Sequence, residues 1–362
     1  MHRSIVIAPD SFKGSLRASE AAEAIAAGWA VARPKDTLTL LPQADGGEGT
    51  VDAIEAAVPG AIRRATGAVT GPDGGQVDGE WLELPGGIAV VELAQSCGLP
   101  LMQQLAPLTA STRGLGEVLA HAIGSGVHSI RIALGGSAST DGGVGALCAL
   151  GLRAMDAAGS PLADGGAALS ALAALDATDL LAPPRGGVTL LTDVDAPLLG
   201  PRGAAAVFGP QKGATREQIA QLEAALARFA ELFGGDPAQP GAGAAGGTGY
   251  GFVTAWGAAV ASGSAAIADL TGLPAAIAAA DVVITGEGRF DEQSLRGKVV
   301  GHTLDLAAEH GTSTAVIAGR LATTPPGWSA SLTELAGSGA AAMAEPARWL
   351  RAAAKAAARS LV

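Results

Sequence analysis

Short apolar runs and helical patterns alternate over the first sixty residues. "SIVIA" (4–8) predicts a buried strand, residues 9–14 a loop, and an alanine-rich pattern a helix over 15–33. "TLTLL" (37–41) predicts a second strand, and a second helix follows over 50–57. Strands that alternate with helices are typical of a parallel sheet, which binds ligands at the carboxyl ends of its strands.

The same alternation returns near the C-terminus. "DVVITG" (281–286) predicts a strand, residues 298–311 a helix and "STAVIAG" (313–319) another strand. A last helix places basic residues on one face, which we expect to face solvent: Arg351, Lys355 and Arg359.

The middle of the chain has a different pattern. Residues 61–98 contain short β-prone segments between turn pairs such as "PDGG", which predicts meandering strands. A helix over 111–126, capped by Ser111 or Thr112, precedes a strand over 129–134. Thr215 and Gln218 form a capping box for a helix whose apolar stripe we expect in the core: Ile219, Leu222, Leu226, Phe229 and Phe233.

These patterns predict a discontinuous α/β architecture. The chain has 362 residues, enough for two domains. The βαβα start and the βαβ end complete one sheet, so residues 1–62 and 280–362 form one domain. Residues 63–279 form a second, inserted α/β domain.

Net charge and cysteine content limit the partners and the cellular compartment that we expect. The net charge of −11 argues against nucleic acid or an anionic membrane as a partner. The two cysteines match no metal or redox spacing, and the N-terminal apolar run is too short for a signal peptide. The charge-free stretch 240–268 is rich in Gly and Ser, so we interpret it as soluble structure and expect a cytoplasmic protein.

Five stretches place charged side chains after small residues at predicted strand ends. They are "APDSFKGS" (Asp10, Ser11, Lys13), "QADGGEG" (Asp45, Glu48), "GGSASTDGG" (Ser137, Ser139, Asp141), "TDVDAPLLGPRGA" (Asp193, Asp195) and "TGEGRFDEQS" (Glu287, Arg289, Asp291). Each alone is typical of an ordinary turn, but a parallel sheet would bring such ends to a common crevice.

The composition of these stretches suits phosphate chemistry. Glycine N–H groups and serine hydroxyls bind phosphate oxygens, carboxylates bind Mg²⁺, and cations neutralise a moving phosphoryl group. Two interpretations stay open at "GGSASTDGG", a strand-to-helix turn or a phosphate cradle, and two at "GPQKGA", where Lys212 is a solvated lysine or a phosphate contact. The chain contains no P-loop, no GxGxxG after its first strand, and no HRD or DFG motif.

The order of these motifs resembles the bacterial glycerate kinase family of the first type, which phosphorylates glycerate with ATP. The matching stretches begin with "IVIAPDSFKGSLRASEAAEAI" and "ADGGEGTVDA", continue through "TRGLGE", "GGSASTDGGVGALCALG" and "FGPQKGA", and end with "GAGAAGGTGYG" and "VITGEGRFDEQSLRGKV". The resemblance implies a flavodoxin-like layered domain made from both chain ends, an inserted domain with a mixed sheet, and an active site in the cleft between them. The usual product of that family is 2-phosphoglycerate.

The resemblance and the five stretches together suggest roles for individual residues. Catalytic candidates are Asp141, Asp193 and Lys13, with Asp141 and Asp193 as alternative bases. ATP phosphates would contact Gly135, Gly136, Ser137, Ser139 and Lys212. Glycerate would contact Ser11 and either Arg113 or Arg289. Mg²⁺ candidates are Asp45, Asp193 and Asp291, with Glu287 and Glu48 as second choices.

Three alternatives to this function remain. One is a glycerate kinase that forms 3-phosphoglycerate, another is a non-catalytic protein that binds small anions, and the third, a dehydrogenase, is disfavoured by the missing nucleotide fingerprint. We expect ATP and Mg²⁺ as cofactors, D-glycerate as the small-molecule partner, no nucleic acid or membrane, and a monomer or homodimer.

Overall fold

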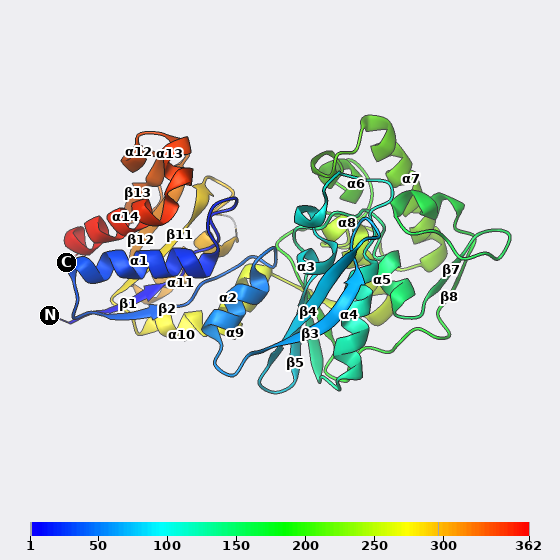
Figure 1. The fold of residues 1–362 in the computed structure, drawn as a ribbon, viewed down its shortest axis with the longest axis horizontal. Coiled ribbons are helices and arrows are strands. Elements are labelled where there is room, and N and C mark those ends of the chain that lie inside the picture. Colours follow the sequence, from blue (N-terminus) through cyan, green and yellow to red (C-terminus); the bar gives the residue numbers. More distant parts are fainter. Residues whose placement is uncertain (1, 296, 362) are drawn as a thin grey trace. The chain divides into compact units, whose positions relative to one another are not determined.

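Both ends of the chain contribute strands to one parallel sheet. The structure is a computed structural model that describes residues 2–295 and 297–361. The chain divides into two compact units (Figure 1). Unit 1 comprises Met1–Asp45, Asp52–Pro59 and Ser262–Val362, and unit 2 comprises Gly46–Val51 and Gly60–Ala261.

The sheet of unit 1 has five strands in the order β13-β12-β11-β1-β2, and every pair is parallel. The strands are β1 (Ser4–Ile7), β2 (Thr37–Leu40), β11 (Val282–Phe290), β12 (Ser313–Leu321) and β13 (Trp328–Ser331). The predicted alternation at both chain ends is therefore confirmed as one parallel sheet.

Helices cover both faces of this sheet. They are α1 (Ala18–Ala32), α2 (Thr50–Ala57), α9 (Gly263–Thr271), α10 (Leu273–Ala278), α11 (Val299–His310), α12 (Leu332–Ala336), α13 (Gly339–Ala344) and α14 (Pro346–Ser360). Ile5 and Ile7 pack in one core with α1 and α14, whereas Val6 packs on the opposite face with α10 and α11. Because both faces are covered, the strands are continuous apolar runs.

Unit 2 contains a mixed sheet of six strands in the order β10-β9-β6-β5-β4-β3. The strands are β3 (Ile62–Thr70), β4 (Gln76–Leu84), β5 (Ile88–Glu92), β6 (Ser129–Ala133), β9 (Val188–Leu191) and β10 (Ala259–Ala261). Strands β3, β4 and β5 form an antiparallel meander, and β5, β6, β9 and β10 are parallel. The predicted meander over residues 61–98 is confirmed.

Short helices and one long helix surround the sheet of unit 2. They are α3 (Leu93–Cys97), α4 (Arg113–Gly124), α5 (Val144–Ala149), α6 (Ala204–Phe208), α7 (Arg216–Phe233) and α8 (Ala244–Trp256), with 3-10 turns η1 (Leu99–Leu101), η2 (Gly166–Ala171) and η3 (Pro210–Lys212). A separate pair joins β7 (Arg153–Met155) to β8 (Ala174–Asp176). Thr215 and Gln218 form the predicted capping box of α7, and its apolar stripe packs in a core.

The units differ from the predicted domain ranges at three places, one of them being that residues 60–62 belong to unit 2. Residues 262–279, predicted in the inserted domain, belong to unit 1 because Ala268, Leu273 and Ile277 pack with Val6 and Val283. Residues 46–51 belong to unit 2, where the Glu92 carboxylate accepts hydrogen bonds from the N–H groups of Gly49 and Val51, each at 3.0 Å.

A search of the described helices for membrane spans finds none with the length and apolar character to cross a bilayer. The charge-free stretch 240–268 instead holds α8, β10 and the start of α9.

Candidate functional site

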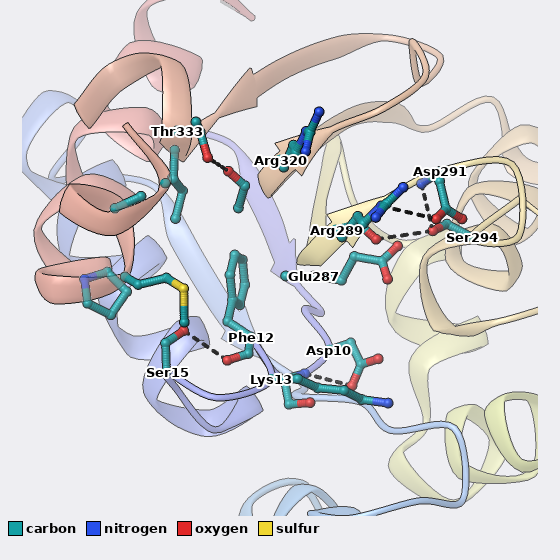
Figure 2. A pocket seen from close by; sticks show the side chains of 18 of the residues that line it. Asp10, Phe12, Lys13, Ser15, Glu287, Arg289, Asp291, Ser294, Arg320 and Thr333 are labelled. Atoms are coloured by element: carbon teal, nitrogen blue, oxygen red, sulfur yellow. Dashed lines mark hydrogen bonds and ion pairs between the residues drawn. The ribbon is translucent and has the colours of Figure 1, made fainter. Parts of the chain in front are cut away.

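A pocket of about 490 Å³ lies in unit 1 (Figure 2). We call it the unit 1 pocket. Its lining holds four carboxylate side chains and four cationic ones: Asp10, Asp45, Glu287, Asp291, Lys13, Arg289, Lys298 and Arg320. Apolar side chains, among them Phe12, Leu332 and Met343, line the rest together with Thr333. Six of the predicted site residues meet here: Ser11, Lys13, Asp45, Glu287, Arg289 and Asp291.

The topology of the sheet explains why these side chains converge. Strands β1, β11 and β12 are parallel neighbours, so their carboxyl ends lie at one edge. The Asp10 N–H donates to the Gly286 carbonyl at 2.8 Å, which extends the pairing to the pocket. The Gln43 N–H donates to the Pro9 carbonyl at 2.9 Å and brings the Asp45 segment to the same edge.

Burial makes two carboxyl groups of the pocket unusual. Burial and then the neighbouring Asp45 carboxylate raise the pKa of Asp10 to about 7, against the smaller opposing effects of the Ser11 N–H and of Lys13. Burial also raises the pKa of Glu287. The Oε1 atom of Glu287 is buried and has no hydrogen-bond partner among the described residues. A carboxyl group that titrates near neutrality is suited to proton transfer.

Arg289 and Asp291 form an ion pair at the mouth of the pocket. The distance from Nε to Oδ2 is 3.4 Å, and 65% of the Arg289 side chain is exposed. Asp291 also organises its own turn, because Oδ1 accepts the Gln293 N–H at 2.9 Å. The Arg289 guanidinium therefore keeps donors available to a ligand.

Unit 2 holds a second polar cluster, around the loop after β6. Lys212 is 2% exposed, and its ammonium donates to the Ser137 hydroxyl at 3.0 Å and to the Ser139 carbonyl. Burial lowers the pKa of Lys212 to about 7, partly opposed by the charge of Asp141. Ser139 Oγ and Thr140 Oγ1 are buried and lack hydrogen-bond partners in the described chain. Lys212 is thus in contact with the predicted phosphate loop from its buried side.

Asp141 is a hub of backbone hydrogen bonds. Its Oδ2 accepts the Thr112 N–H at 2.9 Å and the Thr112 hydroxyl at 2.8 Å, and the Gly145 N–H at 3.3 Å. Its Oδ1 accepts the Gly143 N–H at 3.2 Å. The side chain is 1% exposed, so its carboxylate joins the starts of α4 and α5 inside unit 2.

The loop itself is tied to its surroundings. The N–H groups of Gly135, Ala138 and Gly142 donate to the carbonyls of Gly46, Cys97 and Gly246, at 2.8, 3.0 and 3.0 Å. A Cβ at Gly246 would collide with the Ser139 carbonyl, so glycine permits this close approach. Gly136 is the exposed residue of the loop and Gly135 is half-buried, which leaves these two as its accessible part.

Besides Asp141, Lys212 and the loop 135–139, three more predicted residues lie outside the unit 1 pocket. Arg113 forms a bidentate pair with Asp164 in unit 2, with both distances 2.7 Å. Asp193 follows β9 in unit 2 and is half-buried. Glu48 is exposed in the segment of unit 2 that precedes α2.

The pocket residues with no role predicted from the sequence include Asp10, Lys298, Arg320 and Thr333. Asp10 belongs to the stretch "APDSFKGS", but no role is assigned to it from the sequence. Arg320 follows the same rule as the five stretches, a charged residue at the end of the apolar run "STAVIAG". That signal was sufficient to find it.

The parallel strand ends and the polar pocket beside them define an α/β protein with a small-molecule pocket in the usual place for such a sheet. Comparison with known proteins gives the family. The model of the Glycerate kinase family matches residues 5–362. The chain belongs to this family.

Named relatives agree. Glycerate 2-kinase of Escherichia coli K12 is 41% identical over 328 residues, 88% of this chain and 85% of that protein. Glycerate kinase of Halalkalibacterium halodurans is 42% identical over the same share of each. A crystal structure of a candidate glycerate kinase 2 from Salmonella typhimurium LT2 has a TM-score of 0.84 and 38% identity, and the match covers 100% of this chain and 98% of that one. These matches confirm the predicted α/β fold class.

Proposed function

We propose that this protein transfers the γ-phosphoryl group of ATP to the 2-hydroxyl of D-glycerate, giving 2-phospho-D-glycerate and ADP. The observation that carries the proposal is the 41% identity, across 88% of the chain, to a protein named glycerate 2-kinase. That name also favours the 2-phosphate over the 3-phosphate.

The unit 1 pocket supports this proposal with its chemistry. It combines cations for the substrate carboxylate with carboxyl groups for proton transfer. We assign Ser11 and Arg289 to glycerate and Lys13 to the charge of the transferred group. Asp10 joins Asp141 and Asp193 as a candidate base. We favour Asp10, because it lines the pocket while both carboxylate oxygens of Asp141 already accept hydrogen bonds inside unit 2.

A magnesium ion fits the carboxylates of the pocket. Among the described residues no cluster of three or more His, Cys, Asp or Glu side chains is arranged to hold a metal. Mg²⁺ usually needs only one or two carboxylates, with substrate phosphates and water completing its shell. The unpartnered Oε1 of Glu287 is such a ligand atom, and Asp45 and Asp291 line the same pocket. A bound Mg²⁺ would neutralise phosphate charge; Asp193 remains a further candidate ligand.

In unit 2 we assign the loop 135–139 to the nucleotide phosphates. Gly135 and Gly136 are its accessible residues, and Lys212 places its ammonium against Ser137 and the Ser139 carbonyl. The role of Ser137 and Ser139 is then to hold this loop, with hydroxyl donors near a bound phosphate. The partners we propose are ATP and D-glycerate, in the cytoplasm, without nucleic acid or membrane.

The test is an assay of the purified chain with ATP, Mg²⁺ and D-glycerate, with phosphorus NMR to identify the product. We expect 2-phosphoglycerate. Asp10→Asn is expected to lower kcat at least 100-fold with little change in either KM, because a general base contributes about 10²–10⁴ in rate. Absence of phosphoglycerate at micromolar enzyme would contradict the proposal. Normal turnover by Asp10→Asn would return the role of base to Asp193 or Asp141.

A further inference from the structure

Two arginines stand side by side at the mouth of the unit 1 pocket. Arg289 on β11 and Arg320 on β12 are paired in the parallel register, so both side chains project from the same face of the sheet. Both line the pocket, and Figure 2 shows them as neighbours above Phe12 and Glu287. Like charges on adjacent strands are destabilising unless something neutralises them.

Within the described residues, only one member of this pair has an ion-pair partner. Arg289 is 3.4 Å from Asp291. Arg320 is exposed and forms no hydrogen bond or ion pair with any residue of 2–295 or 297–361. Two guanidinium groups therefore lie beside the single carboxylate of Asp291, which leaves one positive charge in excess.

The backbone around the pair is built to hold it in place. A Cβ at Gly319 would collide with the Gly288 carbonyl, so the two strand ends approach closely here only because residue 319 is a glycine. The Thr333 hydroxyl donates to the Gly319 carbonyl at 2.8 Å and fixes the start of α12 to the end of β12. The Cα positions of both arginines are thus fixed, while their guanidinium groups are exposed.

We propose that Arg289 and Arg320 together bind the carboxylate of the acid substrate, with Arg320 as a specificity-determining residue. The planar donor fork of a guanidinium matches the two oxygens of a carboxylate. Four cations against four carboxyl groups leave the pocket near neutral, which suits a monoanion better than a triphosphate. This inference rests on the proposed function and adds the residue that recognises the acid group.

The experiment compares Arg320→Gln, Arg320→Lys and Arg289→Gln in the full chain, with Arg359→Gln as a matched control. Arg359 is exposed on α14, in unit 1 but outside the pocket. We expect Arg320→Gln to raise KM for D-glycerate at least tenfold and KM for ATP less than twofold. Arg320→Lys should recover part of the loss, because it restores the charge without the fork. Arg359→Gln should match the native chain.

Binding without turnover separates this inference from the proposed function. D-glycerate is titrated calorimetrically into each variant without ATP, and circular dichroism checks that each is folded. Weaker binding of D-glycerate by the Arg320 variants, in proportion to their rise in KM, supports carboxylate binding by the two arginines. A rise in KM for ATP alone would assign the pair to nucleotide phosphate and overturn the carboxylate assignment, as would unchanged constants in an active enzyme. Suppose that the native chain binds D-glycerate through Arg320 but does not phosphorylate it. That result would support carboxylate binding by the two arginines and overturn only the proposed function. A native chain that neither binds nor phosphorylates D-glycerate would overturn both.

Discussion

Lys212 has an unfavourable charge environment in unit 2, and Ala245 an unfavourable backbone conformation. Lys212 is a buried cation bonded to a hydroxyl and a carbonyl oxygen rather than to a carboxylate. Ala245 has φ 51° and ψ 43°, the left-handed conformation, and Gly246 and Gly247 continue it. Both adjoin the loop of residues 135–143, since Gly246 accepts the Gly142 N–H. Two unfavourable residues thus lie beside this loop, as is common at functional sites.

The pH dependence of stability should report the charge of Lys212. The folded state releases the proton near pH 7, whereas the unfolded chain keeps it until about pH 10.5. Between these values the unfolded state binds more protons, so stability should rise with pH. Relative to Lys212→Met, the native chain should gain up to about 1.4 kcal/mol per pH unit. Urea unfolding of both proteins at pH 7, 8 and 9 measures this; parallel curves would mean that Lys212 keeps its ordinary pKa.

Ala245→Gly should stabilise the protein by about 1 kcal/mol, because glycine adopts the left-handed conformation without the penalty of a Cβ. Urea unfolding at pH 7 measures the change. Ala255→Gly is the matched control, since Ala255 lies in the last turn of α8 and glycine lowers helix stability there. A destabilised Ala245→Gly would show that the Ala245 methyl contributes more by packing than its conformation costs.

At the scale of elements, a single carboxylate holds two helix starts together. Asp141 bonds to the N–H of Thr112 before α4 and to the N–H groups of Gly143 and Gly145 at the start of α5. The Thr112 hydroxyl links them again, since it donates to Asp141 and accepts the Ala146 N–H at 3.0 Å. The opening of α5 is therefore fixed by a side chain rather than by the glycines alone.

Asp141→Asn should lower the free energy of unfolding by about 2 kcal/mol or more. An amide has one acceptor oxygen where the carboxylate has two, so buried N–H groups lose their partner. Asp164→Asn, in a half-exposed pair with Arg113, is the control and should cost less than about 1 kcal/mol. An Asp141→Asn variant with native stability but no turnover would instead support the role of Asp141 as the base.

The elements were largely predictable from the sequence, whereas the residues that share the unit 1 pocket were predictable only in part. Apolar runs such as "IVIA" reveal a strand covered on both faces, and Thr215 with Gln218 marks the start of α7 from local pattern alone. The neighbours of a strand depend on crossovers. Arg289 and Arg320 are separated by the whole of α11 and meet only through the register of β11 and β12. Arg113 could not be excluded beforehand either, because its partner Asp164 is fixed by tertiary packing.

At the scale of the whole molecule, apolar cores account for the packing of both units. Each unit has apolar cores of its own, and no three-ligand metal group is present in the described part of the chain. A metal used in turnover would therefore enter with the nucleotide.

Chelation should separate activity from stability. We expect EDTA to abolish phosphoryl transfer while the thermal midpoint of the nucleotide-free protein changes by less than about 1 °C, since a ligand stabilises only a state that binds it. Differential scanning calorimetry with and without EDTA measures the thermal midpoint, and the assay with ATP and D-glycerate measures phosphoryl transfer. A clear fall in the midpoint would reveal a resident structural ion.

The sheet of unit 1 also determines when this unit can fold during translation, because its strands come from two distant parts of the sequence. Helices α1 and α14, the first and last of the chain, pack in one core, and the Arg3 guanidinium donates to the Leu361 carbonyl at 3.2 Å. The strands β11, β12 and β13 emerge only after all of unit 2 has been synthesised. The nascent N-terminal segment must therefore wait, with an apolar strand and helix uncovered, until these strands have been synthesised, whereas unit 2 can fold earlier. A nascent chain that stalls before α14 lacks the last cover of this core, which makes it a natural substrate for chaperones.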